Sequence, residues 1–125
     1  MNMFDAQVDA VRAAITTAGF PKVEIVVAET GWPYRGDAGE EGATVENTQA
    51  YNDGLVAHLH SLVGTPMAAG KSVDTYIFAL YDEDMKPDPT SECSFSLFRL
   101  NLTPTYDADI TKSSSNAAGP VSQVN

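Results

Sequence analysis

Two short and almost continuously apolar segments most constrain the fold of this chain. Residues 23–28 run Val-Glu-Ile-Val-Val-Ala, and residues 73–81 run Val-Asp-Thr-Tyr-Ile-Phe-Ala-Leu-Tyr. Such runs, rich in β-branched and aromatic side chains, are typical of parallel strands that are covered on both faces. A long loop and an expected helix lie between them, which is the order of a βαβ unit. The sequence therefore predicts an α/β fold.

The remaining segments predict two helices and the loop. Apolar residues at helical spacing predict a buried stripe on a helix over residues 4–15 (Phe4, Val8, Val11 and Ile15), with Gly19 placed to end it. The glycine-rich and proline-containing residues 30–43 predict a loop. A second helix is expected from Thr44, whose hydroxyl can cap it, to about Gly64; its apolar stripe is Tyr51, Leu55, Leu59 and Leu62.

Two parallel strands alone leave unpaired backbone edges that a domain must cover. The order of elements fits the last quarter of a (β/α)8 barrel, whose complete form needs about 250 residues. We therefore expect an incomplete (β/α)8 TIM barrel over residues 1–111, containing approximately the last two strands and their helices. Residues 112–125 are rich in Ser, Asn, Ala and Gly and are expected to form a flexible Ser/Pro-containing tail or linker.

Charge and composition exclude several classes of function. Seven Lys and Arg stand against 17 Asp and Glu, a net charge of −10, which excludes a nucleic-acid binder. No apolar run approaches the roughly 18 residues of a membrane span, and the N-terminus does not resemble a signal peptide. Cys93 is the single cysteine, and His58 and His60 lack the spacing of a paired helical metal site. The sequence predicts neither a metal nor an organic cofactor.

Carboxylates follow both apolar segments. Glu29 ends the first, and Asp82 and Glu83 end the second. In a βα barrel the active site lies at the carboxyl ends of the strands, so these positions are candidates for catalysis. The pattern alone leaves open that Glu29 marks only the point where a strand meets water.

Residues 26–33, Val-Val-Ala-Glu-Thr-Gly-Trp-Pro, resemble the signature of glycoside hydrolase family 17, the plant endo-1,3-β-glucanases. The resemblance covers residues 3–112. It continues, in order, through Glu46-Asn47, Tyr51-Asn52, Gly64-Thr65-Pro66, residues 75–83, Lys86, Leu97-Phe98 and Tyr106. It implies a barrel enzyme that hydrolyses internal 1,3-β-glucosidic bonds of β-glucans such as callose or laminarin with retention, and that is secreted or bound to the cell wall.

The resemblance also assigns roles to individual residues. Glu29 matches the catalytic nucleophile, and Glu83, Lys86 and Glu92 match a supporting ionic cluster. Tyr81 and Phe95 match cleft aromatics, and Trp32 supports the nucleophile loop; core packing is the alternative role of all three. The family's general acid follows the fourth strand and has no counterpart here, so the chain alone is expected to be inactive. Ser96 replaces a family glycine, which predicts strain if φ is positive there.

Three further expectations remain open. Asn101-Leu102-Thr103 is an N-glycosylation acceptor sequence that matters only in a secreted protein. By resemblance to longer family members, the tail leads toward a carbohydrate-binding module and in some cases a lipid anchor. The alternative to an enzyme portion is a non-catalytic short product that binds β-glucan or a partner protein.

Overall fold

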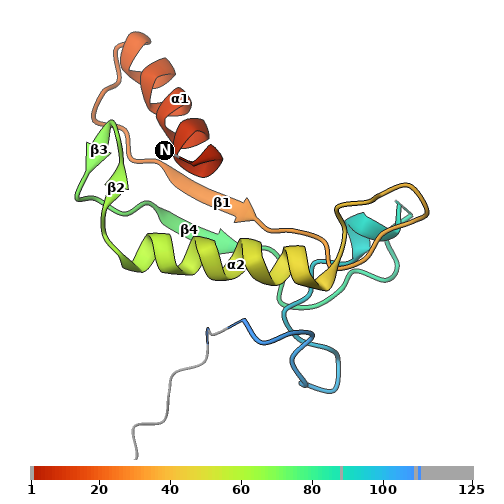
Figure 1. The fold of residues 1–125 in the computed structure, drawn as a ribbon. Helices are drawn as coiled ribbons and strands as arrows, with labels where there is room; N and C mark the ends of the chain where they lie inside the picture. Colours follow the sequence, from red (N-terminus) through yellow and green to blue (C-terminus); the bar gives the residue numbers. More distant parts are fainter. Residues whose placement is uncertain (1, 88, 109, 111–125) are drawn as a thin grey trace, which may run out of the picture.

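A computed structural model of the chain describes residues 2–87, 89–108 and 110. The described part contains two α-helices, four short strands and one 3-10 helix (Figure 1). In chain order they are α1 (Met3–Thr17), β1 (Val26–Thr30), α2 (Val45–His60), β2 (Gly64–Thr65), β3 (Ala68–Ala69), β4 (Asp74–Ile77) and η1 (Thr90–Cys93). The expected tail, residues 112–125, lies outside the described residues.

The β1–α2–β4 segment forms the expected parallel βαβ unit. β1 pairs with β4 in parallel, with Val26 opposite Asp74, and the register shifts between Val27 and Thr30. The helix α2 runs along this strand pair (Figure 1). It is tied to the strand region by Thr30 Oγ1 and Tyr51 OH, 2.5 Å apart. The α/β prediction is therefore confirmed.

The expected burial of both strand faces is wrong for the described part of the chain. Val26 and Tyr76 are 49 % and 65 % exposed, and no residue of β1 or β4 is fully buried. The physical reason is that the described sheet holds only these two strands, so no further strands or helices cover its outer surface. The strands are also displaced from their expected bounds, because β1 begins at Val26 and includes Glu29 while β4 ends at Ile77.

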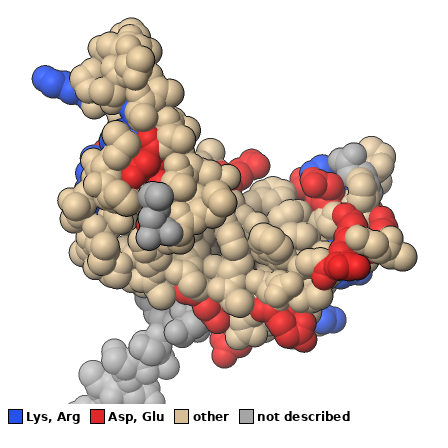
Figure 2. Space-filling view, turned by 45° about the horizontal axis from the view of Figure 1, so that its top comes forward, with Lys and Arg blue, Asp and Glu red and all other residues tan. Residues whose placement is uncertain are grey.

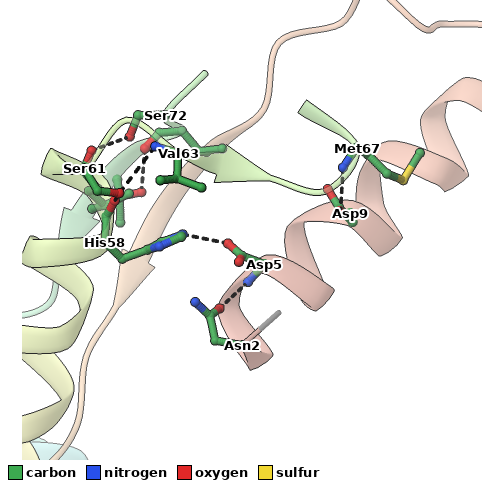
Figure 3. Close-up of polar contacts among 11 residues, drawn as sticks. Asn2, Asp5, Asp9, His58, Ser61, Val63, Met67 and Ser72 are labelled. Atoms are coloured by element: carbon green, nitrogen blue, oxygen red, sulfur yellow. Dashed lines mark hydrogen bonds and ion pairs between the residues drawn. The ribbon is translucent and has the colours of Figure 1, made fainter. Parts of the chain in front are cut away.

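The first helix is anchored by buried carboxylates as well as by apolar contact. Val8 is buried as expected, but Val11 is 50 % exposed, so the predicted apolar stripe is only partly covered. Asp5 Oδ1 lies 2.8 Å from His58 Nε2 on α2, and Asp9 Oδ2 accepts from the backbone N–H of Met67 at 3.1 Å (Figure 3). These partners satisfy Asp5 Oδ1 and Asp9 Oδ2, whereas Asp9 Oδ1 is buried without a hydrogen-bond partner among the described residues.

The second helix begins as predicted and ends earlier than predicted. Thr44 Oγ1 accepts from the N–H of Asn47, which confirms the expected cap. The helix ends at His60 rather than near Gly64, which leaves Leu62 62 % exposed with a φ of 56°. A small antiparallel hairpin, β2–β3, follows and was not predicted. Gly64 is required in it, since its φ is +71° and a Cβ would lie 2.3 Å from the carbonyl oxygen of Ala68.

The segment after β4 packs against the C-terminal part of the described chain. Ala79 N–H donates to Phe95 O at 3.1 Å, and Leu97 N–H donates to Ala79 O at 2.9 Å. Leu97 and Tyr106 are each 7 % exposed and belong to one small core. Asn52 of α2 donates to the Tyr106 hydroxyl at 2.5 Å. This packing brings Lys86, Glu92 and Phe95 to the carboxyl end of the strand pair.

Candidate active site

A cleft of about 240 Å³ lies at the carboxyl ends of β1 and β4. Four residues singled out from the sequence lie around it: Glu29, Lys86, Glu92 and Phe95. The rest of its lining is Thr30, Gly31 and Phe78. Glu29 is exposed near the end of β1, and within the described part of the chain its carboxylate has no hydrogen-bond or ion-pair partner. It is therefore available to a ligand in the cleft.

The ionic cluster surrounds Lys86. The ammonium nitrogen Nζ lies 3.5 Å from Glu83 Oε2 and 3.7 Å from Glu92 Oε2. Both glutamates are about half exposed, so these pairs contribute at most about 1 kcal/mol each to stability. Glu83 does not line the cleft, but it is ion-paired with Lys86, which does. The cluster thus places a positive charge at the edge of a cleft that also contains the Glu29 carboxylate.

Close backbone packing holds the two sides of the cleft together. A Cβ on Gly31 would lie 2.1 Å from the carbonyl oxygen of Phe78, so only glycine allows the loop after β1 to pass there. The rings of Phe78 and Phe95 meet edge to face, with centroids 5.4 Å apart and an interplanar angle of 63°. The nucleophile candidate and the cleft aromatic therefore lie on adjacent, fixed segments.

Trp32 and Tyr81 lie outside the lining of this cleft. The indole N–H of Trp32 donates to Gly42 O at 2.7 Å, and its ring lies 5.7 Å from that of Tyr51. Trp32 thereby fixes residues 31–43 against α2. Tyr81 is half-buried beyond the end of β4.

Asp82, one of the carboxylates that follow the second apolar segment, is the centre of a network with Tyr34 and Arg35 that the sequence did not predict. Its carboxylate accepts from Tyr34 OH at 2.5 Å and from the backbone N–H of Ser96 at 3.1 Å, and it lies 3.6 Å from the guanidinium of Arg35. Burial, followed by the hydrogen bond to Asp82, raises the pKa of Tyr34 above its ordinary value. These residues line a second cavity of about 520 Å³. The only feature of the sequence that pointed to Asp82 was its position directly after the apolar segment of residues 73–81.

A second polar cluster joins the long loop to η1. Asp37 accepts from the hydroxyl of Thr90 at 2.5 Å and from its backbone N–H at 3.1 Å. Glu40 accepts from Ser91 Oγ and from the N–H of Asp37. The hydrogen bonds from Thr90 and Ser91 hold the pKa values of Asp37 and Glu40, respectively, below their usual range. Acidic side chains outnumber basic ones on the face shown in Figure 2, and several gather at the right, where the long loop and η1 lie (Figure 1).

Ser96, which replaces a glycine of the family pattern, fits without backbone strain. Among the described residues other than glycine, only Leu62 and Leu102 have a positive φ, so the strain expected at Ser96 is absent. Ser96 is 2 % exposed, and its hydroxyl lies 3.1 Å from that of Thr105. The Cys93 thiol donates to the carbonyl oxygen of Lys86 at 3.5 Å.

The described ranges contain neither a metal-binding cluster nor a membrane-spanning helix. Within residues 2–87, 89–108 and 110, no three His, Cys, Asp or Glu side chains gather in a way that could hold a metal ion. No helix in this same part of the chain has both the length and the apolar character needed to cross a membrane.

The chain is similar to known proteins over most of its length. Residues 1–110 match the profile of the glycosyl hydrolases family 17. The chain is 61 % identical over 123 residues to glucan endo-1,3-beta-glucosidase 7 of Arabidopsis thaliana, covering 98 % of this chain and 24 % of that protein. It is 52 % identical over 119 residues to a glucan endo-1,3-beta-D-glucosidase of Olea europaea, covering 95 % of this chain and 26 % of the relative.

The solved structures point the same way. CJP38, described as a beta-1,3-glucanase and allergen of Cryptomeria japonica pollen, superimposes with a TM-score of 0.77 at 46 % identity. The match covers 84 % of this chain and 32 % of CJP38. The chain thus spans about a quarter of the length of the curated relatives it matches. With a profile match over residues 1–110 and these close relatives, the chain belongs to glycosyl hydrolase family 17.

Proposed function

We propose that this chain contributes the nucleophile side of the active site of an endo-1,3-β-glucosidase. The observation that carries the proposal is the cleft in which Glu29, Lys86, Glu92 and Phe95 meet at the carboxyl ends of parallel strands. Carboxyl ends of strands are where βα-barrel enzymes place their catalytic groups. The chain would form the last two βα units of an incomplete (β/α)8 barrel. The activity for which the relatives are named supplies the substrate class, a 1,3-β-glucan.

In the proposed mechanism Glu29 is the nucleophile of a retaining hydrolysis. Its carboxylate attacks the anomeric carbon while a general acid protonates the leaving oxygen, and water then resolves the glycosyl-enzyme. Retaining enzymes hold the two carboxyl groups about 5–5.5 Å apart. The acid has no counterpart in this sequence by the family pattern, so the chain alone is expected not to turn over. Loss of general acid assistance alone costs about 10²–10⁴-fold in rate.

The other cleft residues bind the sugar and support the nucleophile. The half-buried Phe95 ring lines the cleft and offers an apolar surface for the C–H face of a pyranose. Lys86, held between Glu83 and Glu92, places a positive charge next to the cleft, where Glu29 acts. Trp32 and Tyr81 act from outside the lining, Trp32 by fixing the loop that follows Glu29.

A chimera tests the catalytic proposal. Residues 1–125 replace the matching quarter of the Arabidopsis relative, and the release of reducing ends from laminarin is measured. The active chimera is expected to lose turnover in Glu29→Gln and to keep it in Glu41→Gln, an exposed loop carboxylate outside the cleft. A 2-deoxy-2-fluoro glycoside with a good leaving group is expected to label the peptide that carries Glu29. Full activity of Glu29→Gln, or a label on another peptide, would refute the assignment.

The same material tests the non-catalytic alternative. Residues 1–125 alone are titrated with laminarin oligosaccharides. Binding that Phe95→Ala weakens, without release of reducing ends, would support a β-glucan-binding role for the chain by itself.

We also propose an extracellular or cell-wall location, because the proposed substrate is a wall polysaccharide. A carbohydrate-binding module or lipid anchor attached beyond residue 125 remains a proposal drawn from the family resemblance. Fractionation of the source tissue, followed by detection of peptides from residues 1–110, tests the location.

A further inference from the structure

One exposed loop carries the only N-glycosylation sequence of the chain. Residues 101–103 are Asn-Leu-Thr, and no other asparagine is followed two positions later by Ser or Thr. An oligosaccharide is bulky and polar, so a usable acceptor must lie on the surface. The position and geometry of Asn101 therefore decide whether the sequence can be modified.

The backbone presents this sequence at the tip of a tight loop. Arg99 N–H donates to Thr103 O at 2.9 Å, and Leu102 N–H donates to Arg99 O at 2.8 Å. The loop is closed by an antiparallel bridge between Phe98 and Pro104. Residues 99–103 are all exposed. In Figure 1 this loop, in blue, projects from the lower edge of the fold. It therefore has room for a large substituent.

Hydrogen bonds fix the orientation of the Asn101 side chain. Thr103 donates to Asn101 Oδ1 twice, from its backbone N–H at 3.1 Å and from its hydroxyl at 2.6 Å. Because a backbone N–H needs an acceptor, the atom it meets must be the carboxamide oxygen and not the nitrogen. The nitrogen Nδ2 consequently turns away from Thr103, and among the described residues none hydrogen-bonds to it. The atom that would carry a glycan is free.

The apolar neighbours of Asn101 give an independent reason for a cover at this loop. Leu100 and Leu102 are 82 % and 69 % exposed on either side of it. The C–H faces of a linked sugar can pack against such side chains while its hydroxyls stay in water. A glycan on Asn101 would thus shield two leucines that otherwise face solvent.

We propose that Asn101 is an N-glycosylation site, which rests on the extracellular location in the proposed function. In the transfer, Asn101 Nδ2 forms a bond to the anomeric carbon of an oligosaccharide carried on a lipid diphosphate. The bond from that carbon to the diphosphate oxygen breaks, the lipid diphosphate leaves, and Nδ2 releases one proton. Oligosaccharyltransferase and its lipid donor supply the reactants.

The glycan would stand clear of the catalytic cleft. Asn101 lines the 520 Å³ cavity together with Tyr34 and Arg35, and this cavity shares no lining residue with the cleft of Glu29. Glycosylation is therefore expected to leave laminarin hydrolysis by the chimera unchanged within about twofold, which separates this site from a substrate subsite.

Translation in the presence of endoplasmic-reticulum microsomes tests the proposal. The full chain is fused to a cleavable signal sequence, and its mass is compared before and after endoglycosidase H. The wild type is expected to gain one glycan, which Asn101→Gln and Thr103→Ala abolish and Thr103→Ser retains. An unmodified wild type, in microsomes that glycosylate a known control protein, would overturn the proposal, as would a glycan that persists in Asn101→Gln.

The readouts keep this proposal apart from the proposed function. A glycan gained at Asn101 while the chimera fails to cleave laminarin would leave the site standing and remove the enzymatic proposal. Cleavage of laminarin by a chimera whose Asn101 stays unmodified in microsomes would do the reverse.

Discussion

Alanine at Gly31 is a direct test of how the cleft is assembled. The Cβ of alanine would lie 2.1 Å from Phe78 O and 3.2 Å from both Phe78 C and Phe95 Cδ1. The first distance is about 1.3 Å short of the 3.4 Å at which ordinary contact begins. The obstructing atom is a backbone oxygen, so no side-chain rotation can relieve the clash. The loop that follows Glu29 must therefore move away from the end of β4.

The expected cost follows from two contributions. Overpacking of this kind typically costs about 1–3 kcal/mol. Moving Phe78 also weakens the 2.8 Å bond from its N–H to Thr30 O, a bond of a type that contributes about 0.5–1.5 kcal/mol. We expect Gly31→Ala to lower the free energy of unfolding by about 2–4 kcal/mol.

A second glycine provides a matched control. Gly54 lies in α2, and a Cβ there meets nothing within 4 Å. Gly54→Ala is expected to raise the free energy of unfolding by about 0.5–1 kcal/mol, because alanine is the better helix former. Urea unfolding followed by circular dichroism measures both variants. A Gly31→Ala midpoint equal to or above that of the wild type, at an unchanged slope, would refute the packing argument.

Two predictions concern ionisation. Because the pKa of Tyr34 is raised, its contribution to stability is present below the ordinary tyrosine pKa and is lost as pH rises through the folded value. In Asp82→Asn, alkaline absorbance titration should show the pKa of Tyr34 returning toward the ordinary value. An unchanged titration would contradict the network. Because the pKa values of Asp37 and Glu40 are lowered, their contributions to stability are present above the ordinary carboxyl pKa and are lost as pH falls through the folded pKa values. Proteolysis of residues 36–43 should therefore accelerate in acid, and Thr90→Val should already be cleaved faster at neutral pH. Equal cleavage rates of the wild type and Thr90→Val across this pH range would contradict the prediction.

The sequence predicted those features that depend on local pattern. The cap at Thr44 and the helix that follows it depend on nearby residues, and both are found. The parallel pairing of the two apolar segments is not local, but it follows from the strand–helix–strand order and is also found. Helix ends were less predictable. The chain leaves α2 at His60 because residues 62–64 adopt the left-handed and turn conformations that lead into the β2–β3 hairpin. The apolar spacing that continues through Leu62 does not predict these backbone conformations.

The candidate site was less accessible to sequence reasoning than the fold. Glu29 and Lys86 carry recognisable neighbours in the sequence, and they do line one cleft. The Asp82 network joins residues 48 positions apart, Tyr34 and Asp82, through contacts that no local spacing encodes. Tyr34 lies in the loop after β1 and Asp82 in the segment after β4, where side-chain direction depends on the packing of residues 94–98. Contacts of this kind become visible only when the loops are placed in space.

The two strands have the apolar pattern of buried strands, yet their side chains are partly or largely exposed. Val26 and Tyr76 are side chains that a parallel strand normally buries, and here about half or more of each is exposed. Full burial of such a side chain stabilises a fold by about 1.5–3 kcal/mol. In the two-stranded sheet described here, the exposed side chains do not contribute much of that stabilisation. A parallel strand of this kind requires further layers to cover it, and in CJP38 the matched region is only 32 % of the chain. The residues of β1 and β4 are thus suited to a sheet wider than the two strands described, as the barrel proposed for the active enzyme would provide.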